Sequence, residues 1–158
     1  MPKFGSKWGA PTSAAPVASP RAINWAMPNA AESAVDIYIR AWNERDPAVR
    51  AKMVEACFAA DGRWVTRSRE IRGRVALANE MSRIRADPDF VRVRLTSAID
   101  ASGTTFRFRG VAERRDGTTP EAFDAGEIDA AGQISLLLTF AGPLRELDEA
   151  PASETSKS

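Results

Sequence analysis

The hydrophobic pattern of this sequence changes its period once, near Asp87-Pro88. Before this point, apolar residues recur every three to four positions, which is the spacing of one face of an α-helix. After it, apolar and polar residues alternate, as in β-strands with one buried face. The 158 residues suffice for one domain of ordinary size. The sequence therefore predicts an α+β domain, with three N-terminal helices packed on a strongly bent, mainly antiparallel sheet.

Three helices are expected before the change of period. The first begins after Asn29, an N-cap that can form a capping box with Glu32. The second begins at Asp46-Pro47, with proline at the first helical position, and ends at Asp61-Gly62. A third helix fits residues 74–85. The apolar stripes expected to face the core are Ala31, Val35, Tyr38 and Trp42 in the first helix, Val49, Met53, Ala56 and Cys57 in the second, and Leu77, Met81 and Ile84 in the third.

The rest of the chain should form strands joined by short turns. One short strand is expected at residues 63–68, between the second and third helices. The alternating segments beyond Pro88 are 90–99, 106–113, 122–129 and 133–141, with turn sequences at 101–103, 116–117 and 131–132. In the last segment, one face is expected to carry Ile134, Leu136, Leu138 and Phe140.

Two flanking segments differ in composition from the domain between them. Residues 1–29 contain five of the ten prolines and show no period, so a flexible tail is expected there. Residues 146–158 are polar and form a second expected tail, which leaves 30–145 as the folded domain. No apolar run reaches the ~18 residues of a membrane span, and no secretory signal is visible. We therefore expect a cytoplasmic protein that does not contact membranes.

Charge is distributed unevenly along the chain, although its net value is +1. Residues 63–115 carry 13 Arg against six acids, and residues 116–158 carry nine acids against two bases. A nucleic-acid surface could produce such a pattern, but no recognition helix or aromatic RNA platform accompanies it. We therefore expect basic and acidic strands to pair within one sheet, and no nucleic-acid partner.

The residue inventory restricts the chemistry. The sequence contains no histidine and a single cysteine, Cys57. Ser-His-Asp and Cys-His catalysis, an intramolecular disulfide and an ordinary zinc site are therefore excluded. Glycine-rich phosphate loops and paired metal carboxylates are not visible, so neither a metal nor a cofactor is expected. Proton transfer would have to use a carboxylate, Tyr38, Lys, Arg or Cys57.

Five short segments, in this order and spacing, carry a resemblance to a known superfamily. They are Tyr38–Asp46, Phe58–Trp64, Ile71–Leu77, Phe123–Ile134 and Phe140–Leu144. The chain resembles the NTF2-like superfamily over about residues 31–145, and within it the SnoaL-like group, named for a polyketide cyclase. The resemblance implies a cone-shaped pocket between helices and a curved sheet. It also implies an acidic or basic group inside an apolar cone, as in the cyclases, ketosteroid isomerases, epoxide hydrolases and dehydratases of this superfamily.

Two positions depart from the pattern of the family. Gly110 stands where the family often has a large aromatic residue, and Gln133 stands where it often has Arg. Both changes would suit an engineered or drifted scaffold with extra room in its pocket.

Alternation sends one carboxylate of residues 122–129 into the pocket. One register turns Asp124 inward and the other turns Glu127 inward. We favour Asp124, because its register leaves both Glu127 and Asp129 outside, so that only one charge is buried. An apolar site would raise the pKa of this carboxylate toward neutrality and make it a usable acid or base. Pairing with Arg107 or Arg109 would instead make the carboxylate structural.

Tyr38 is the second catalytic candidate, because ketosteroid isomerases of the superfamily have a hydrogen-bonding tyrosine on the first helix. A tyrosine hydroxyl can donate to a developing oxyanion; the alternative is a core aromatic whose hydroxyl meets a backbone partner. The candidates for substrate-binding positions are Trp42, Trp64, Phe108, Met53, Met81 and Glu127.

Three functions remain open from the sequence. The first is a SnoaL-like enzyme of the cyclase, isomerase or hydrolase type, which acts on a hydrophobic, carbonyl-bearing small molecule through Asp124 and Tyr38. The second is a non-catalytic ligand-binding or association module of the same fold. The third is an Arg-rich surface for an acidic partner. A homodimer is also expected through the outer sheet face, with Glu113 or Glu127 answering Arg92, Arg94, Arg107 and Arg109 across the interface.

Overall fold

Three helices and seven strands make up the described part of the chain in the computed structural model, which covers residues 29–144 and 147. The expected tails lie almost entirely outside these residues. In chain order the elements are α1 (Ala30–Asn43), α2 (Pro47–Cys57), β1 (Phe58–Thr66), β2 (Glu70–Arg72), α3 (Arg74–Arg85), β3 (Phe90–Leu95), β4 (Asp100–Ser102), β5 (Thr105–Arg114), β6 (Glu121–Ile128) and β7 (Ile134–Ala141).

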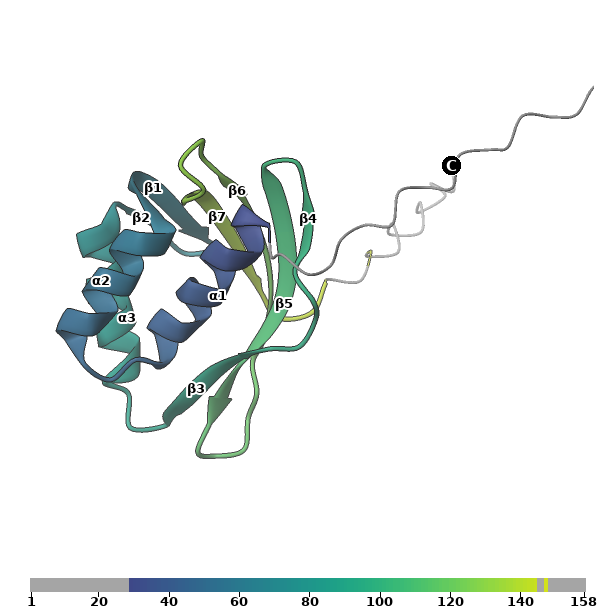
Figure 1. Cartoon of the computed structure of the whole chain (residues 1–158). Coiled ribbons are helices and arrows are strands. Elements are labelled where there is room, and N and C mark those ends of the chain that lie inside the picture. The colour runs from purple at the N-terminus through teal and green to yellow at the C-terminus, as the bar shows by residue number, and fades with distance from the viewer. Residues whose placement is uncertain (1–28, 145–146, 148–158) are drawn as a thin grey trace, which may run out of the picture.

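All seven strands belong to one curved sheet, with the three helices gathered on one side of it (Figure 1). The strand order is β2-β1-β7-β6-β5-β3, and β4 pairs with β5 beside this path. The neighbouring strands are antiparallel except β1 and β7, which are parallel. The predicted α+β class, with three helices on a bent and mainly antiparallel sheet, is confirmed.

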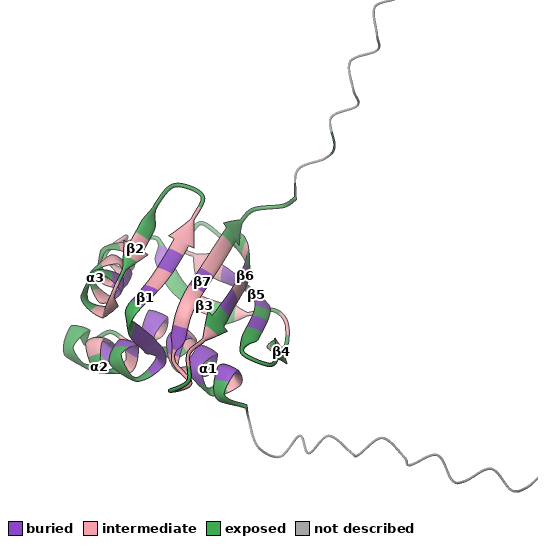
Figure 2. Ribbon diagram, turned by 90° about the horizontal axis from the view of Figure 1, so that it is seen from above, coloured by how far each residue is buried: buried purple, intermediate pink, exposed green. Residues whose placement is uncertain are grey.

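The helix starts follow the capping chemistry that the sequence predicted. The Asn29 side chain accepts from the Glu32 N–H at 2.8 Å, and the Glu32 carboxylate accepts from the Asn29 N–H at 3.0 Å. The Asp46 carboxylate caps α2 by accepting from the Ala48 N–H at 2.8 Å. Gly73, with φ of 82°, precedes α3. The predicted stripe of α1 is buried against the sheet, as the purple segments of Figure 2 show.

The predicted end of the second helix and half of its predicted stripe are wrong. Val49 is 40% exposed and Ala56 is also exposed, whereas Arg50 is buried. The Arg50 guanidinium donates to the carbonyls of Glu44 at 2.7 Å and Arg45 at 3.2 Å. These carbonyls follow α1, where the last helical C=O groups have no intrahelical partner, so an arginine is useful inside the fold here.

Helix α2 ends four residues earlier than expected. It stops at Cys57, and β1 begins at the next residue, so Asp61-Gly62 lies inside this strand rather than at a turn. An additional Cβ at Gly62 would lie 2.6 Å from the Phe58 ring. The glycine therefore serves close packing within the strand and does not terminate a helix.

Only the first part of the segment 90–99, predicted as one strand, forms a strand. Strand β3 ends at Leu95, and β4 contains Ala101 and Ser102, which were expected in a turn. Of the three residues of the predicted turn, only Gly103, with φ of 61°, lies in a turn. A register shift at the start of β3 leaves Val91 46% exposed. Such a bulge turns one side chain away from the face that alternation assigns to it.

A second bulge changes the faces of β7. The pairing with β6 shifts by one residue between Ile134 and Leu136, so these two side chains do not share a face as predicted. Ile134 and Leu137 are fully buried, whereas Phe140 is 56% exposed. The face that carries Leu136, Leu138 and Phe140 is therefore the outer one.

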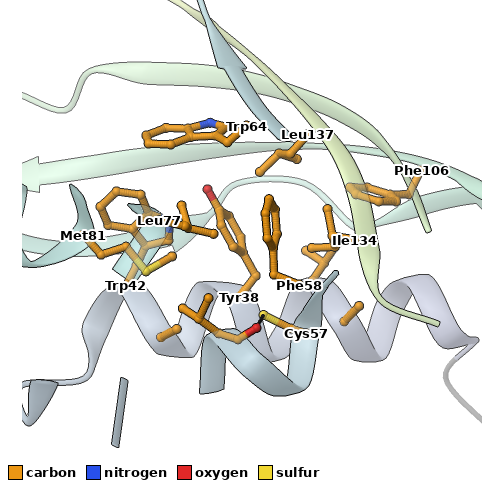
Figure 3. Close-up of a cluster of buried hydrophobic side chains, with 14 of the residues drawn as sticks. Tyr38, Trp42, Cys57, Phe58, Trp64, Leu77, Met81, Phe106, Ile134 and Leu137 are labelled. Atoms are coloured by element: carbon orange, nitrogen blue, oxygen red, sulfur yellow. Dashed lines mark hydrogen bonds between the residues drawn. The ribbon is translucent and has the colours of Figure 1, made fainter. Parts of the chain in front are cut away.

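Strand register defines two faces of the sheet. Phe108, Asp124 and Thr139 lie opposite one another on β5, β6 and β7, and together they form part of the face toward the helices, here called the inner face. The next positions along these strands point to the outer face. The fully buried core between the inner face and the helices includes Phe58, Leu77, Met81, Ile134 and Leu137 (Figure 3).

Candidate functional site

A cavity of about 360 Å³ lies between α1 and the inner face of the sheet. Most of its wall is apolar. The polar groups along it include Tyr38, Trp64, Asp124 and Thr139, and the exposed residues at its mouth include Arg67, Ser68, Pro120 and Glu121. A cavity of this size, with few polar groups in an apolar wall, is typical of a small-molecule site.

Asp124 is the buried carboxylate of this cavity. Its residue is 7% exposed, and its Oδ1 accepts a short hydrogen bond from the Thr139 hydroxyl. Burial raises the pKa of Asp124 to about 6, and the Thr139 hydrogen bond opposes this rise. Among the described residues, no cation pairs with Asp124: Arg107 bonds to Asp100 at 2.8 Å, and Arg109 is exposed. The structure thus does not contain the Arg-paired alternative.

Tyr38 presents a neutral hydroxyl to the same cavity. It extends from α1 toward Trp64 on the sheet, as Figure 3 shows. Burial is the main cause that raises its pKa well above 10, followed by the negative charge of Asp124, while an interaction with Trp42 lowers the pKa. Tyr38 therefore stays protonated at physiological pH and can donate a hydrogen bond.

Aromatic side chains form the walls next to these two groups. Trp42 contacts Tyr38 and Trp64 edge-on, with ring-centroid distances of 6.2 and 5.8 Å. Phe108 stacks with Phe106 at 6.2 Å and lies beside Asp124 in the sheet register. The predicted wall residues Trp42, Trp64 and Phe108 all line the cavity.

Three predicted binding residues lie elsewhere. Met81 is fully buried in the core, and Met53 packs half-buried against that core, so neither lines the cavity. Glu127 is exposed, because the observed register turns Asp124 inward and the residue three positions later outward. Of the two carboxylates that the sequence left open, Asp124 faces the cavity.

Thr139 was missed by the sequence reasoning. It follows Leu136, Leu137 and Leu138, a run that is apolar on both faces and so hides which face is inner. Pairing with β6 places Thr139 directly opposite Asp124. Counting two positions on from the buried Leu137 would have identified it, but only once the burial of Leu137 was known.

The two departures from the family pattern have structural explanations. Gly110 borders the cavity, but an added Cβ would lie 3.1 Å from the Arg94 carbonyl oxygen, so glycine also permits the close approach of β3 and β5. Gln133 accepts from the Arg74 guanidinium at 2.9 Å and donates to the Glu55 carbonyl at 2.9 Å. It therefore connects the end of α2, the start of α3 and the start of β7.

The expectation that Glu113 answers arginines of a second chain is corrected by its contacts. Glu113 bonds to Arg92 at 2.6 Å and to Arg94 at 2.9 Å within its own chain. These bonds join β3 and β5, which both belong to the Arg-rich segment 63–115. Among the described residues, no ion pair joins this segment to the acids of 116–158, so the predicted pairing of opposite charges between basic and acidic strands is wrong.

Two features are absent from residues 29–144 and 147. In this part of the chain, no cluster of three or more Cys, Asp or Glu side chains could hold a metal ion. No helix of the same part is long and apolar enough to cross a membrane.

The sequence and the fold of this chain differ in how far they resemble known proteins. No family model matches the sequence, and no curated protein matches it significantly. A SnoaL-like family protein from Agrobacterium tumefaciens str. C58 superposes with a TM-score of 0.65 and 23% identity, over 72% of this chain and 98% of that protein. An LEH-like epoxide hydrolase from M. tuberculosis gives a TM-score of 0.55 and 19% identity, over 72% and 83% of the two chains.

A de novo designed protein with a curved β-sheet has the same architecture. Its TM-score is 0.59 at 17% identity, over 74% of this chain and 89% of the designed one. The chain therefore has the NTF2-like cone fold that these proteins share. Since natural enzymes and a designed scaffold adopt this fold alike, the function has to be argued from the cavity.

Proposed function

We propose that this protein is a SnoaL-like acid/base enzyme, of the cyclase, isomerase or hydrolase type, that acts on a hydrophobic, carbonyl-bearing small molecule. One observation carries the proposal: Asp124 is buried in an apolar cavity, pairs with no cation among the described residues, and has its pKa raised to about 6. A carboxylate with this pKa is mostly ionised at pH 7 and is a stronger base than an exposed aspartate.

The cavity supports proton transfer next to a carbonyl group. Ionised Asp124 removes a proton from the carbon beside the carbonyl, and the electron pair of that C–H bond moves onto the carbonyl oxygen. The Tyr38 hydroxyl donates a hydrogen bond to the resulting enolate oxygen. Protonated Asp124 then returns its proton to the same or to a conjugated carbon, which regenerates the carboxylate. Trp42 and Phe108 exclude water and bind the apolar body of the substrate.

Proton exchange into a simple ketone tests this proposal. We expect the wild-type protein to accelerate the loss of α-proton signal of 1-tetralone in D₂O, followed by ¹H NMR. Asp124→Asn should reduce the exchange to the rate in buffer, whereas Asp100→Asn, which alters an exposed carboxylate, should not change it. A wild-type rate equal to that of buffer, for 1-tetralone and for larger tricyclic ketones, would contradict the proposal.

The likeness to a designed scaffold favours a second candidate, a non-catalytic ligand-binding or association module, natural or engineered. The apolar walls would bind such a ligand whether or not Asp124 is ionised. A neutral ligand such as 1-tetralone should then raise the melting temperature of the wild type and of Asp124→Asn equally, without proton exchange in either.

The outer face of the sheet supports a homodimer as part of this proposal. Phe123 and Phe140 are 39% and 56% exposed there, with ring centroids 6.4 Å apart. Arg109 and Glu121 border this pair, so a two-fold partner could meet it with opposite charges. Light scattering at tens of micromolar should report a dimer, and Phe140→Glu should convert it to a monomer.

Placement in the cytoplasm, and a folded domain bounded by residues 30 and 145, remain predictions.

A further inference from the structure

Three neighbouring strands supply a chain of hydrogen bonds that ends at Asp124. The indole N–H of Trp64, on β1, donates to the hydroxyl oxygen of Thr139, on β7, at 2.8 Å. The Thr139 hydroxyl in turn donates to Oδ1 of Asp124, on β6. Thr139 and Asp124 are directly opposite each other in the sheet register.

The donor order in this chain is fixed when Asp124 is ionised. An indole N–H can only donate, and an ionised carboxylate can only accept. The Thr139 hydroxyl therefore accepts from Trp64 and directs its single proton to Oδ1 of Asp124.

The second carboxylate oxygen of Asp124, Oδ2, is accessible from the cavity. No described residue donates to Oδ2. Among the described residues, no fully buried side-chain oxygen or nitrogen lacks a partner, so Oδ2 is not sealed inside the protein. Asp124 lines the cavity, which is therefore where Oδ2 is accessible.

We propose that Trp64 and Thr139 are positioning residues, which hold Oδ1 of the ionised carboxylate as a hydrogen-bond acceptor and so make Oδ2 the oxygen that exchanges a proton with the substrate. The inference rests on the proposed function, in which Asp124 is the acid/base group. It adds two residues that act through Asp124, and it assigns different roles to its two oxygens.

Besides burial, the hydrogen-bond chain is the main local influence on the pKa of Asp124, because few charged groups lie near this carboxylate. From α1, the titratable side chain that faces the cavity is Tyr38, which stays neutral. At the mouth, Arg67 and Glu121 are exposed to solvent, which screens them. Strands β1, β5 and β7 contribute Trp64, Phe108 and Thr139, none of which is charged. The Thr139 hydrogen bond holds the pKa of Asp124 below the value that burial alone would give.

Two substitutions at Thr139 separate positioning from packing. Thr139→Val keeps the shape of the side chain but removes the hydroxyl, and Thr139→Ser keeps the hydroxyl. We expect Thr139→Val to raise the pKa of Asp124 by about one pH unit, because the lost hydrogen bond stabilises the ionised carboxylate by roughly the corresponding free energy. The pKa can be measured by ¹³C NMR of the side-chain carboxyl. The acid limb of the 1-tetralone exchange profile should move to higher pH by the same amount. Thr139→Ser should keep both values.

Substitutions of the two tryptophans test the first link. Trp64→Phe removes the N–H that fixes the Thr139 hydroxyl, so the pKa of Asp124 should rise by less than in Thr139→Val, and the exchange rate should fall about 10-fold. Trp42→Phe alters the same cavity but not the hydrogen-bond chain from Trp64 to Asp124, so it should leave the pKa of Asp124 unchanged. Thermal melts verify that each variant is folded. If Thr139→Val does not fold, the pKa of Asp124 in Trp64→Phe still tests the proposal.

The results distinguish the two proposals. An unchanged pKa in both Thr139→Val and Trp64→Phe, or equal shifts in Thr139→Val and Thr139→Ser, would overturn the positioning role. The expected pKa shifts, together with a wild-type exchange rate equal to that of buffer, would support the hydrogen-bond chain and overturn the enzymatic function.

Discussion

Asp124 and Glu113 lie on neighbouring strands of the same sheet, yet their surroundings shift their acidity in opposite directions. Asp124 faces the cavity with a hydroxyl as its partner, and burial raises its pKa to about 6. Glu113 lies at the surface, and hydrogen bonds from Arg92 and then Arg94 lower its pKa to about 2. The inner face desolvates a carboxylate, whereas the arginine-rich pairing of β3 and β5 stabilises its charge.

The difference shows what makes a carboxylate useful for chemistry. Thirteen arginines occur between residues 63 and 115, so a cation could readily have been placed beside Asp124. Alternation directs Arg107 and Arg109 of the adjacent strand to the outer face instead. A group that must gain and lose a proton near neutral pH is thereby kept apart from the ion pairs of the same sheet.

Asp124→Asn removes the buried carboxylate and should have the largest effect on the exchange rate. Exchange of 1-tetralone should fall by roughly 1,000-fold, within the range of a lost general base. The amide can still accept from Thr139, so the fold should persist. Kinetics of purified wild type and variant at pH 7 provide the measurement.

The same variant should be more stable than the wild type above pH 6. The pKa of Asp124 is raised in the folded state, so the folded protein binds more protons and loses stability as the pH rises from about 4 to about 6. A rise in pKa from 3.8 to about 6 corresponds to about 3 kcal/mol. Urea unfolding across this pH range should show the slope in the wild type and a reduced slope in Asp124→Asn; parallel curves would contradict the assigned environment of Asp124.

Gly126→Ala tests the inner face by steric means. An added Cβ would lie 2.3 Å from the Leu136 carbonyl oxygen and 2.6 Å from the Phe106 ring. Because one of these atoms belongs to the backbone, we expect a loss of roughly 3 kcal/mol in the free energy of unfolding. Gly117→Ala, at a surface turn without neighbours within 4 Å, is a comparison in which only the positive φ is strained. Equal losses at both positions would show that the inner face is less tightly packed than described.

Much of this architecture was predictable from local patterns. The capping box at Asn29 and the start at Asp46 follow from short-range chemistry, and both were predicted correctly. Alternation reduced the choice of buried carboxylate to Asp124 or Glu127. Patterns of this kind depend on neighbours in sequence, which is why one chain is enough to detect them.

The errors arose where distant segments decide the structure. The bulges beside Val91 and Ile134 depend on how two strands pair, and neither is encoded in the local period. Arg50 is buried because α1 ends next to it, and propensity alone would leave an arginine exposed. Thr139 acquires its role from Trp64, which lies 75 positions away in the sequence.

Tyr38→Phe should have a smaller effect than the changes above. It removes the proposed donor to the enolate oxygen, so exchange of 1-tetralone should fall about 100-fold. The hydroxyl faces the cavity rather than the fully packed core, so the melting temperature should change little. A variant with wild-type exchange would mean that the cavity stabilises the enolate without Tyr38.

Glu113→Gln should have the smallest effect, confined to stability. A lowered pKa contributes stability above about 4.5 that is lost as the pH falls toward about 2, so the variant should melt slightly below the wild type at pH 7. The difference should shrink between pH 4.5 and pH 2, and 1-tetralone exchange should be unaffected. A change in exchange rate would show that the surface arginine cluster and the cavity are coupled.

The parallel pairing of β1 with β7 governs when this domain can form during synthesis. Until residues 134–141 leave the ribosome, β2-β1 and β6-β5-β3 are separate pieces without a common sheet. Contacts this distant in sequence slow folding, because a long loop must close before they form. The last strand also brings Thr139, so the completed sheet and the hydrogen-bonded carboxylate arise in the same step. A nascent chain that stops before β7 would therefore expose the apolar inner face, and such intermediates are prone to aggregate.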